Sequence, residues 1–204
     1  MDCLNFIVEE IHTVVAATTD DMGLPVTCAI DMMDADEKGL YFLTAKGKGF
    51  YNRLKKERYM ALTGIKGEDT MSCVAVSVCG KVCELGREPL SRLFEKNPYM
   101  SEIYPTEKSR EALTVFMLYQ GRGEWFDLSK KPIERAVFTF GNAETVQEGY
   151  YITSNCMGCR TCETVCPQAC IDFTVMPAVI EQVHCLHCGN CKTVCPKNAI
   201  VRKG

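Results

Sequence analysis

Two stretches near the C-terminal end decide how this chain is organised. The first is Cys156-Met-Gly-Cys159-Arg-Thr-Cys162-Glu-Thr-Val-Cys166-Pro167, and the second is Cys185-Leu-His-Cys188-Gly-Asn-Cys191-Lys-Thr-Val-Cys195-Pro196. Both follow the pattern C-x2-C-x2-C-x3-C-P. Closely spaced cysteines that stay reduced more often bind metal than form disulfides. Proline after the fourth cysteine stiffens the chain and removes a backbone donor. The repeat therefore predicts ligands of a metal cluster.

The distribution of cysteine supports metal binding over disulfide bonding. The chain has 204 residues and 14 cysteines, of which nine fall in the last 49 residues. A secreted disulfide scaffold is short and rich in cysteine throughout. The remaining composition, with 47% hydrophobic and 24% charged residues, is typical of a globular protein. The length predicts one domain of about 150 residues and an appendage of about 50, which is too small to fold without a staple.

The charge balance excludes two classes of partner. Lys and Arg number 23 against 26 Asp and Glu, so no basic excess attracts nucleic acid or an anionic membrane. No apolar run approaches the roughly 18 residues of a membrane span. The start, MDCLNFIVEEI, lacks a basic region followed by an apolar one, so no signal peptide is predicted. We therefore expect a cytoplasmic protein, where clustered thiols stay reduced and bind metal.

The repeated pattern resembles the two-cluster bacterial ferredoxin, in which each [4Fe–4S] cluster takes three cysteines of one run and the fourth of the other. The resemblance covers the whole segment from residue 156 to the end. It implies that cluster I takes Cys156, Cys159, Cys162 and Cys195, and that cluster II takes Cys185, Cys188, Cys191 and Cys166. Zinc is the alternative, but zinc ribbons use C-x2-C pairs without a third cysteine and a terminal C-P, so iron–sulfur is favoured.

Three further residues near the repeat need an interpretation. Cys170 aligns with Ala199 between the two halves, which indicates a small packed position rather than a ligand. His184 and His187 flank the second run, where all four cysteines are already present. We interpret both histidines as surface residues that tune the cluster modestly.

The first two thirds of the chain read as short strands with one helix among them. Strands are predicted at His12–Thr19, Leu24–Met33, Leu40–Ala45, Tyr59–Ile65, Met71–Leu85, Gly123–Leu128 and Ala136–Phe140, and a helix at Phe50–Arg58 with Leu54 inward. Asp34–Gly39 is predicted to be a polar turn, in which Asp34 belongs to a solvated acidic cluster. Ala112–Tyr119 fits either helix or strand. Within Met71–Leu85 the valines share one face, which we assign to the core. The pattern predicts a mainly β protein with helices (α+β), built on a small barrel.

The order of elements in this part is strand–turn–strand–turn–strand–KGKG–helix–strand, and it runs from AATTDDMGLPV through YFLTAKGKGFYNRLKK to MALTG. This order is similar to the opening of the FMN-binding split barrel, the pyridoxamine 5'-phosphate oxidase-like superfamily. The resemblance covers roughly residues 6–145. It implies a split β-barrel, an FMN phosphate held at Thr44, Lys46, Gly47 and Lys48, and Val26–Met32 along the flavin ring. It also implies a homodimer with FMN at the subunit interface. Two cations, a hydroxyl and glycines suit a phosphate, although a solvated Lys-Gly loop has the same composition.

The function hypotheses follow from the two halves. Residues 1–148 are predicted to form the FMN-binding barrel and residues 149–204 the two-cluster ferredoxin domain. Together they predict a flavin/iron–sulfur oxidoreductase or electron-transfer protein, which exchanges electrons with a redox partner protein or a small-molecule acceptor. The alternatives are a carrier without a substrate of its own, or a sensor that binds flavin or haem and uses the clusters structurally. Residues 119–127 lack the histidine of the oxidase substrate motif, which argues against vitamin B6 oxidase activity.

Overall fold

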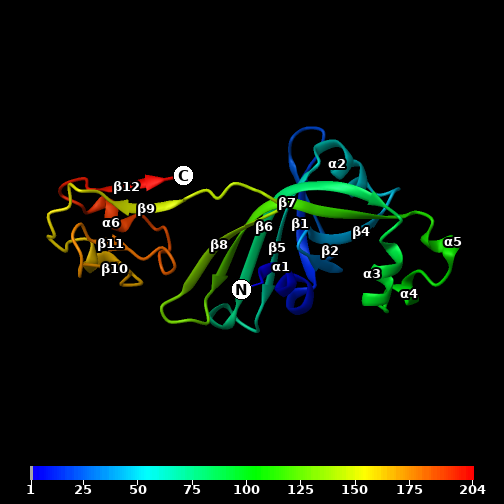
Figure 1. Ribbon diagram of the computed structural model, residues 1–204, viewed down its shortest axis with the longest axis horizontal. Helices are drawn as coiled ribbons and strands as arrows, with labels where there is room; N and C mark the ends of the chain where they lie inside the picture. Colours follow the sequence, from blue (N-terminus) through cyan, green and yellow to red (C-terminus); the bar gives the residue numbers. More distant parts are fainter. Residues whose placement is uncertain (1) are drawn as a thin grey trace.

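Eight strands of the computed structural model, which describes residues 2–204, form one antiparallel sheet (Figure 1). Its order is β2-β1-β5-β6-β7-β4-β3, and β8 pairs with β7. The result is a split barrel, which confirms the predicted fold class. The strands are β1 (Thr13–Thr19), β2 (Pro25–Asp31), β3 (Asp34–Asp36), β4 (Gly39–Ala45), β5 (Tyr59–Lys66), β6 (Val74–Gly86), β7 (Leu113–Asp127) and β8 (Glu134–Phe140).

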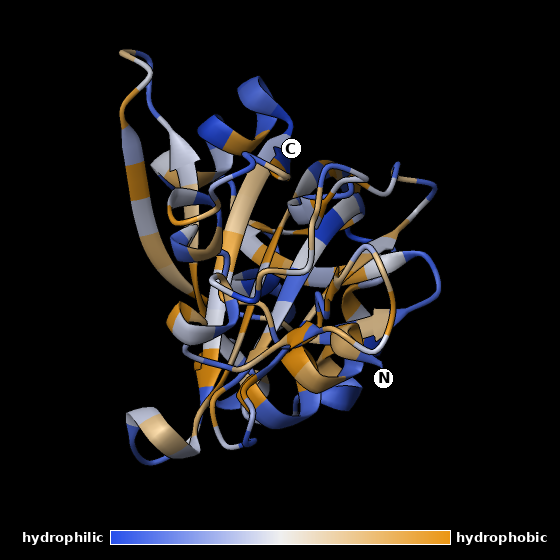
Figure 2. Cartoon of the chain, turned by 90° about the vertical axis from the view of Figure 1, so that its left-hand side faces the viewer, coloured by the Kyte–Doolittle hydropathy of each residue, from blue (hydrophilic) through white to orange (hydrophobic). Residues whose placement is uncertain are grey.

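The barrel core follows from the alternation of side chains along the strands. Val76, Val78 and Val82 of β6 are buried, as the face pattern predicted. Figure 2 shows orange and paler segments alternating along the long strands. Phe42 of β4 stacks on Phe116 of β7 with 5.8 Å between ring centroids. Helix α2 (Gly49–Glu57) closes one side of this core with Phe50 and Leu54, which confirms the inward position of Leu54.

One strand is longer than the sequence indicated. The segments predicted at Ala112–Tyr119 and Gly123–Leu128 fall on a single element, β7, whose 15 residues run from Leu113 to Asp127. Gly121 and Gly123 interrupt its apolar run, so the local pattern breaks there although the strand continues. A Cβ at Gly121 would lie 2.5 Å from the carbonyl oxygen of Cys79 on β6, so only glycine lets the two strands pair this closely.

A second, smaller core lies on the other face of β4. It is covered by the short helices α3 (Leu90–Lys96) and α4 (Met100–Ile103), and the exposed helix α5 (Glu107–Arg110) follows them. The polar turn predicted around Asp34 is instead strand β3, and Asp34 is buried. Its carboxylate pairs with Arg92 and Lys96 of α3, so this acidic residue fixes the helices on the sheet.

The N-terminal segment seals one end of the barrel. Helix α1 (Cys3–Phe6) begins at Asp2, whose carboxylate accepts the backbone N–H of Asn5, and it continues as the π-helix η1 (Ile7–Ile11). Phe6 packs edge-on against Trp125, with 4.6 Å between ring centroids. Trp125 is buried in the core, which agrees with the packing role that is common for tryptophan.

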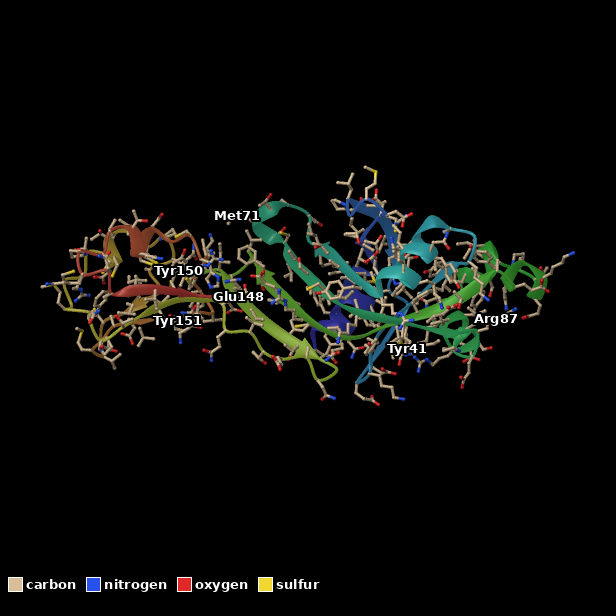
Figure 3. All side chains as sticks on the ribbon, turned by 90° about the horizontal axis from the view of Figure 1, so that it is seen from above. Tyr41, Met71, Arg87, Glu148, Tyr150 and Tyr151 are labelled. Atoms are coloured by element: carbon tan, nitrogen blue, oxygen red, sulfur yellow. The ribbon has the colours of Figure 1, made fainter. Side chains whose placement is uncertain are left out.

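The C-terminal part has little regular structure. Strands β9 (Gly149–Ile152) and β12 (Ile200–Lys203) pair, as do β10 (Ile171–Asp172) and β11 (Val179–Ile180). The other elements are the 3₁₀ turns η2 (Thr70–Ser72), in the barrel, and η3 (Glu163–Val165), and helix α6 (Asn190–Thr193). Figure 3 shows Tyr150 and Tyr151 at the root of this part, beside Glu148. Within residues 2–204, no helix is long and apolar enough to cross a membrane.

Candidate functional site: two cysteine pockets and a basic loop

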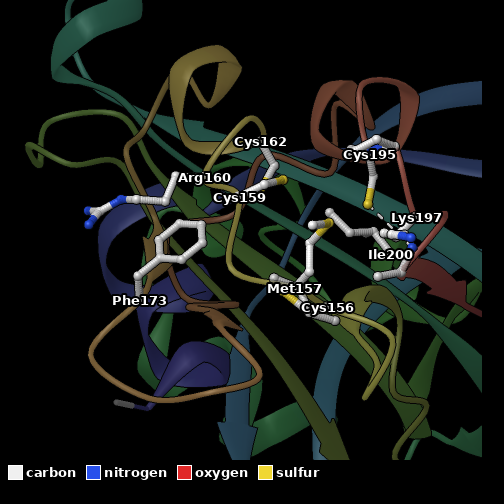
Figure 4. Close-up of a pocket in the computed structure, with 12 residues that line it drawn as sticks. Cys156, Met157, Cys159, Arg160, Cys162, Phe173, Cys195, Lys197 and Ile200 are labelled. Atoms are coloured by element: carbon white, nitrogen blue, oxygen red, sulfur yellow. Dashed lines mark hydrogen bonds between the residues drawn. The ribbon is translucent and has the colours of Figure 1, made fainter.

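The structure gathers the eight repeat cysteines into two separate pockets. Cys156, Cys159, Cys162 and Cys195 line the first cysteine pocket, which Figure 4 shows. Cys166, Cys185, Cys188 and Cys191 line the second cysteine pocket. Each pocket thus holds three cysteines of one run and the last cysteine of the other, in the same two sets that the resemblance implied. The ligand role itself stays a prediction.

Two short antiparallel strand pairings bring the distant cysteines together. Ile152 of β9 faces Ile200 of β12, and the backbone N–H of Thr153 donates to the carbonyl of Ala199 at 2.8 Å. This pairing sets Cys156 beside Cys195. In the other half, β10 pairs with β11, and the N–H of Glu181 donates to the carbonyl of Cys170 at 2.9 Å, which sets Cys166 beside Cys185.

The pockets suit a cluster better than a single ion. Within residues 2–204, no three His, Cys, Asp or Glu side chains converge as one metal ion requires. Zinc binds thiolates at about 2.3 Å, whereas a four-iron cluster places its thiolates on four different irons, so its cysteines stand further apart. Apolar side chains such as Ile152, Phe173 and Ile200 line the first pocket with the cysteines. The donor set and its surroundings therefore fit a [4Fe–4S] cluster in each pocket.

The thiols within the pockets differ in their surroundings. Burial raises the pKa of Cys162, and it raises the pKa of Cys191 to about 11. A hydrogen bond from the Thr161 hydroxyl lowers the pKa of Cys159, which is exposed. Thiolates are the ligands of iron, so a bound cluster must supply the positive charge that holds the buried thiols deprotonated.

Cys170 lies nearer the second pocket than the alignment with Ala199 suggested. It is buried, as a packed position should be, but it lines the pocket, and its Sγ lies 3.5 Å from Sγ of Cys166. The two pockets are therefore unequal, since Ala199 occupies the corresponding place beside the first.

The histidines of the second run contact the barrel instead of lying on the surface. His184 Nδ1 donates to the carbonyl of Ile133 at 2.9 Å. Nη1 of Arg135 lies 2.6 Å from Nδ1 of His187. Burial and the nearby guanidinium lower the pKa of His187. Sequence reasoning could not find these contacts, because the partners are 51 and 52 residues apart and neither segment shows a pairing pattern.

The predicted phosphate loop forms a tight turn before helix α2. The N–H of Lys48 donates to the carbonyl of Ala45 at 3.1 Å, and Lys48 is the N-cap residue. Lys46, Gly47 and Lys48 are exposed, whereas Thr44 is buried in β4. A Cβ at Gly47 would meet nothing within 4 Å. The loop is therefore open to a ligand, and free N–H groups of the first turn of α2 attract an anion.

Arg53 is a third cation near this loop, and the sequence did not single it out. Arg53 lies one turn into α2 and donates from Nε to the Thr18 hydroxyl at 2.8 Å. The charges of Arg53 and Lys48 both lower the pKa of the Cys28 thiol of β2, but burial has the larger effect and raises this pKa overall. The cations therefore lie beside β2, the strand expected to follow the flavin ring. The helical spacing from Gly49 to Arg53 was the signal that could have identified Arg53.

Comparisons with known proteins match each half separately. Residues 155–199 match the family profile of the 4Fe-4S dicluster domain. A sequence search of curated proteins found no match. The barrel has the fold of a NimC/NimA family protein from Clostridium acetobutylicum, with 16% identity and a TM-score of 0.56 over 68% of this chain and 90% of that one.

Two further structures share the barrel fold. One is a protein of the pyridoxinephosphate oxidase family from Clostridium acetobutylicum, related to general stress protein 26, with 20% identity and a TM-score of 0.52 over 66% of this chain and 89% of that one. The other is a heme binding protein from Mycobacterium smegmatis, with 12% identity and a TM-score of 0.53 over 67% of this chain and 56% of that one. The chain thus joins a barrel with the fold of these proteins to a segment that matches the profile of the 4Fe-4S dicluster domain.

Proposed function

We propose that this protein transfers electrons between FMN bound at the barrel and two [4Fe–4S] clusters, each held by one cysteine pocket. The observation that supports this most strongly is the sorting of the eight cysteines into two sets of four, in a chain whose barrel has the fold of a pyridoxinephosphate oxidase family protein. FMN exchanges two electrons with a substrate and releases them singly, which matches the one-electron capacity of each cluster. We also propose that residues 1–148 and 149–204 form the two units.

The residues of the chain would bind and orient the cofactors. Lys48, Arg53 and the N–H groups at the start of α2 would hold the FMN phosphate, because compact cations and free donors favour a dianion. The cysteine thiolates would hold the irons, and the apolar walls would keep water from the clusters. The reduction of a small molecule at the flavin is our preferred activity, and an electron carrier without a substrate is the alternative.

We further propose that the barrel dimerises through its outer sheet face. Val15 of β1 and Ile65 of β5 lie on neighbouring strands of this face and are 55% and 63% exposed. Large apolar side chains at such exposure on adjacent strands indicate an interface. A dimer of this kind would complete the flavin site from a second chain.

The function is tested by cofactor analysis and rapid kinetics on protein purified without oxygen. We expect about eight irons and eight sulfides per chain, with one FMN per chain. Photoreduced flavin should pass electrons to the clusters within one turnover, seen as bleaching of the broad iron–sulfur absorption. Protein that contains haem instead of flavin, or flavin that never reduces the clusters, would contradict the proposal.

The phosphate loop gives a second prediction. Lys48→Ala should weaken FMN binding about tenfold, because it removes a charge-assisted contact of about 1.4 kcal/mol. The affinity for riboflavin, which lacks the phosphate, should not change. Fluorescence titration of the apoprotein measures both constants. Lys38→Ala removes an exposed cation in another turn and serves as the control. Equal weakening of FMN and riboflavin would show that Lys48 does not bind phosphate.

A further inference from the structure

The two cysteine pockets differ in how they meet the barrel. Four contacts join the start of β8 to the second pocket, and all of them come from Ile133 and Arg135. The N–H of Ile133 donates to Oε1 of Gln168 at 2.9 Å, and the carbonyl of Ile133 accepts from His184. The N–H of Arg135 donates to the carbonyl of Val183 at 2.7 Å. The guanidinium of Arg135 lies against His187 and also pairs with Glu124 of β7.

Each of these contacts ends within two residues of a cysteine of the second pocket. Gln168 is two residues from Cys166, His184 precedes Cys185, and His187 precedes Cys188. We call this set of contacts the β8 clip. It covers the second pocket from the barrel side, so a large partner cannot approach the pocket from that direction.

The first pocket faces away from the barrel. In Figure 1 the loop that follows β9, which carries Cys156, Cys159 and Cys162, lies at the end of the molecule remote from the sheet. Within residues 2–204, no hydrogen bond or ion pair joins this loop to the barrel. Cys159 is exposed, whereas Cys162 is buried in the pocket wall.

The rim of the first pocket is apolar and basic. Met157, Val175 and Met176 are 60%, 50% and 57% exposed. Exposed apolar side chains normally occur singly on a protein surface, so a group of them indicates an interaction site. Met157 lines the pocket, and Met176 lies beside it, because a Cβ at Gly158, the neighbour of Met157, would lie 3.0 Å from Cε of Met176; Val175 precedes Met176 in the chain. We call these three side chains the distal rim.

The charged residues that line the same pocket are cations. Arg160 and Lys197 stand on opposite sides of it (Figure 4). Arg160 also pairs with Glu163, so its charge is partly compensated. Residues 149–204 carry five Lys and Arg against three Asp and Glu, whereas the rest of the chain carries an excess of acid.

We propose that the distal rim, with Arg160 and Lys197, is the docking surface for an acidic protein that carries one electron at a time. The inference rests on the proposed function in that both pockets hold clusters, and it makes cluster II the inner relay and cluster I the outlet. An apolar centre with a charged border is the usual composition of a transient interface, and opposite charge steers the encounter. In the transfer, one electron leaves the reduced cluster and enters the carrier.

The test uses the full protein reduced with dithionite and a flavodoxin as the acidic carrier. The cluster gives up one electron, and the flavodoxin flavin takes it with a proton from water to form its neutral semiquinone. Stopped-flow absorption measures the second-order rate constant. Arg160→Glu and Lys197→Glu should each lower this constant about tenfold at low salt. Lys203→Glu, an equal charge reversal at the barrel side of the same part, should change it less than twofold.

The salt dependence of the unaltered protein gives an independent measurement. The whole chain is acidic, so its net charge alone predicts repulsion from flavodoxin and a rate constant that rises with salt. Docking at the basic rim predicts the reverse, a rate constant that falls as salt is added. A rising constant would overturn the proposal, even if a variant at Arg160 failed to assemble its cluster.

Two other outcomes would also overturn it. If Met157→Ser/Met176→Ser converted a dimer into a monomer while the flavodoxin rate stayed unchanged, a second copy of the chain would be the occupant of the rim. If Lys203→Glu slowed the reaction as much as Lys197→Glu, the rim would have no special role. Because dithionite supplies the electrons, a protein without FMN would contradict the proposed function and leave this test valid.

Discussion

The double variant Cys156→Ser/Cys195→Ser is expected to retain about four irons per chain, whereas Cys156→Ser/Cys166→Ser is expected to retain almost none. Both variants remove Cys156 and one further cysteine, the last of the second run in one case and the last of the first run in the other. They differ because Cys195 lines the same pocket as Cys156, whereas Cys166 lines the other pocket. The first variant therefore removes two ligands from one cluster, and the second variant removes one ligand from each cluster.

Iron and sulfide analysis with native mass spectrometry measures these contents on anaerobically purified protein. Cys3→Ser changes a cysteine of the barrel and should keep about eight irons. Cys170→Ala should also keep them, because Cys170 is assigned no ligand role even though it touches Cys166. If Cys156→Ser/Cys195→Ser lost both clusters and Cys156→Ser/Cys166→Ser kept one, each cluster would be held by a single run and the assignment would be wrong.

Removal of iron is expected to unfold residues 149–204 and leave the barrel folded. The buried core of the C-terminal part contains eight residues, four of which are cysteines, and its strands are only two to four residues long. Such a core cannot offset the conformational entropy of about 50 residues. In small metal-bound domains the binding free energy, about 10–16 kcal/mol for zinc fingers, is the folding free energy. The clusters should therefore supply most of the free energy that keeps residues 149–204 folded.

Hydrogen exchange read by mass spectrometry checks this expectation before and after chelation under reducing conditions. Peptides from β9 and β12 should lose their protection, while peptides from β6 and β7 keep theirs and so provide the internal control. Protection of β9 and β12 that survives full loss of iron would contradict the expectation. It would show that the short strands and their contacts with β8 fold this part without metal.

The sequence predicted those features that depend on local pattern. The two cysteine runs, the valine face of β6 and the inward position of Leu54 each follow from fixed spacing along the chain, and the structure agrees with each placement. The valines alternate because a strand turns every second side chain inward, and this rule needs no knowledge of the partner strand. The barrel architecture required the family resemblance as well, since short strands alone do not determine their order.

The features that were missed depend on contacts between distant residues. Asp34 looked like part of a solvated turn because its cationic partners, Arg92 and Lys96, lie about 60 residues further along the chain. β7 looked like two elements because Gly121, which the close pairing with β6 requires, interrupts the apolar run of the strand. His187 looked exposed because nothing near it in sequence indicates Arg135. All three features depend on contacts with residues that are distant in sequence, and the periodicity of the local sequence does not reveal such contacts.

The β8 clip also determines how the two halves of the molecule behave over time. If residues 149–204 were attached to the barrel only through residues 141–148, this part would move freely relative to the barrel, and the proposed electron transfer would depend on that motion. The clip fixes its position by main-chain and side-chain hydrogen bonds, so the gap between the halves is set by the architecture and not by diffusion. The rate of the proposed electron transfer across this gap should then depend neither on the viscosity of the medium nor on the length of the connecting segment.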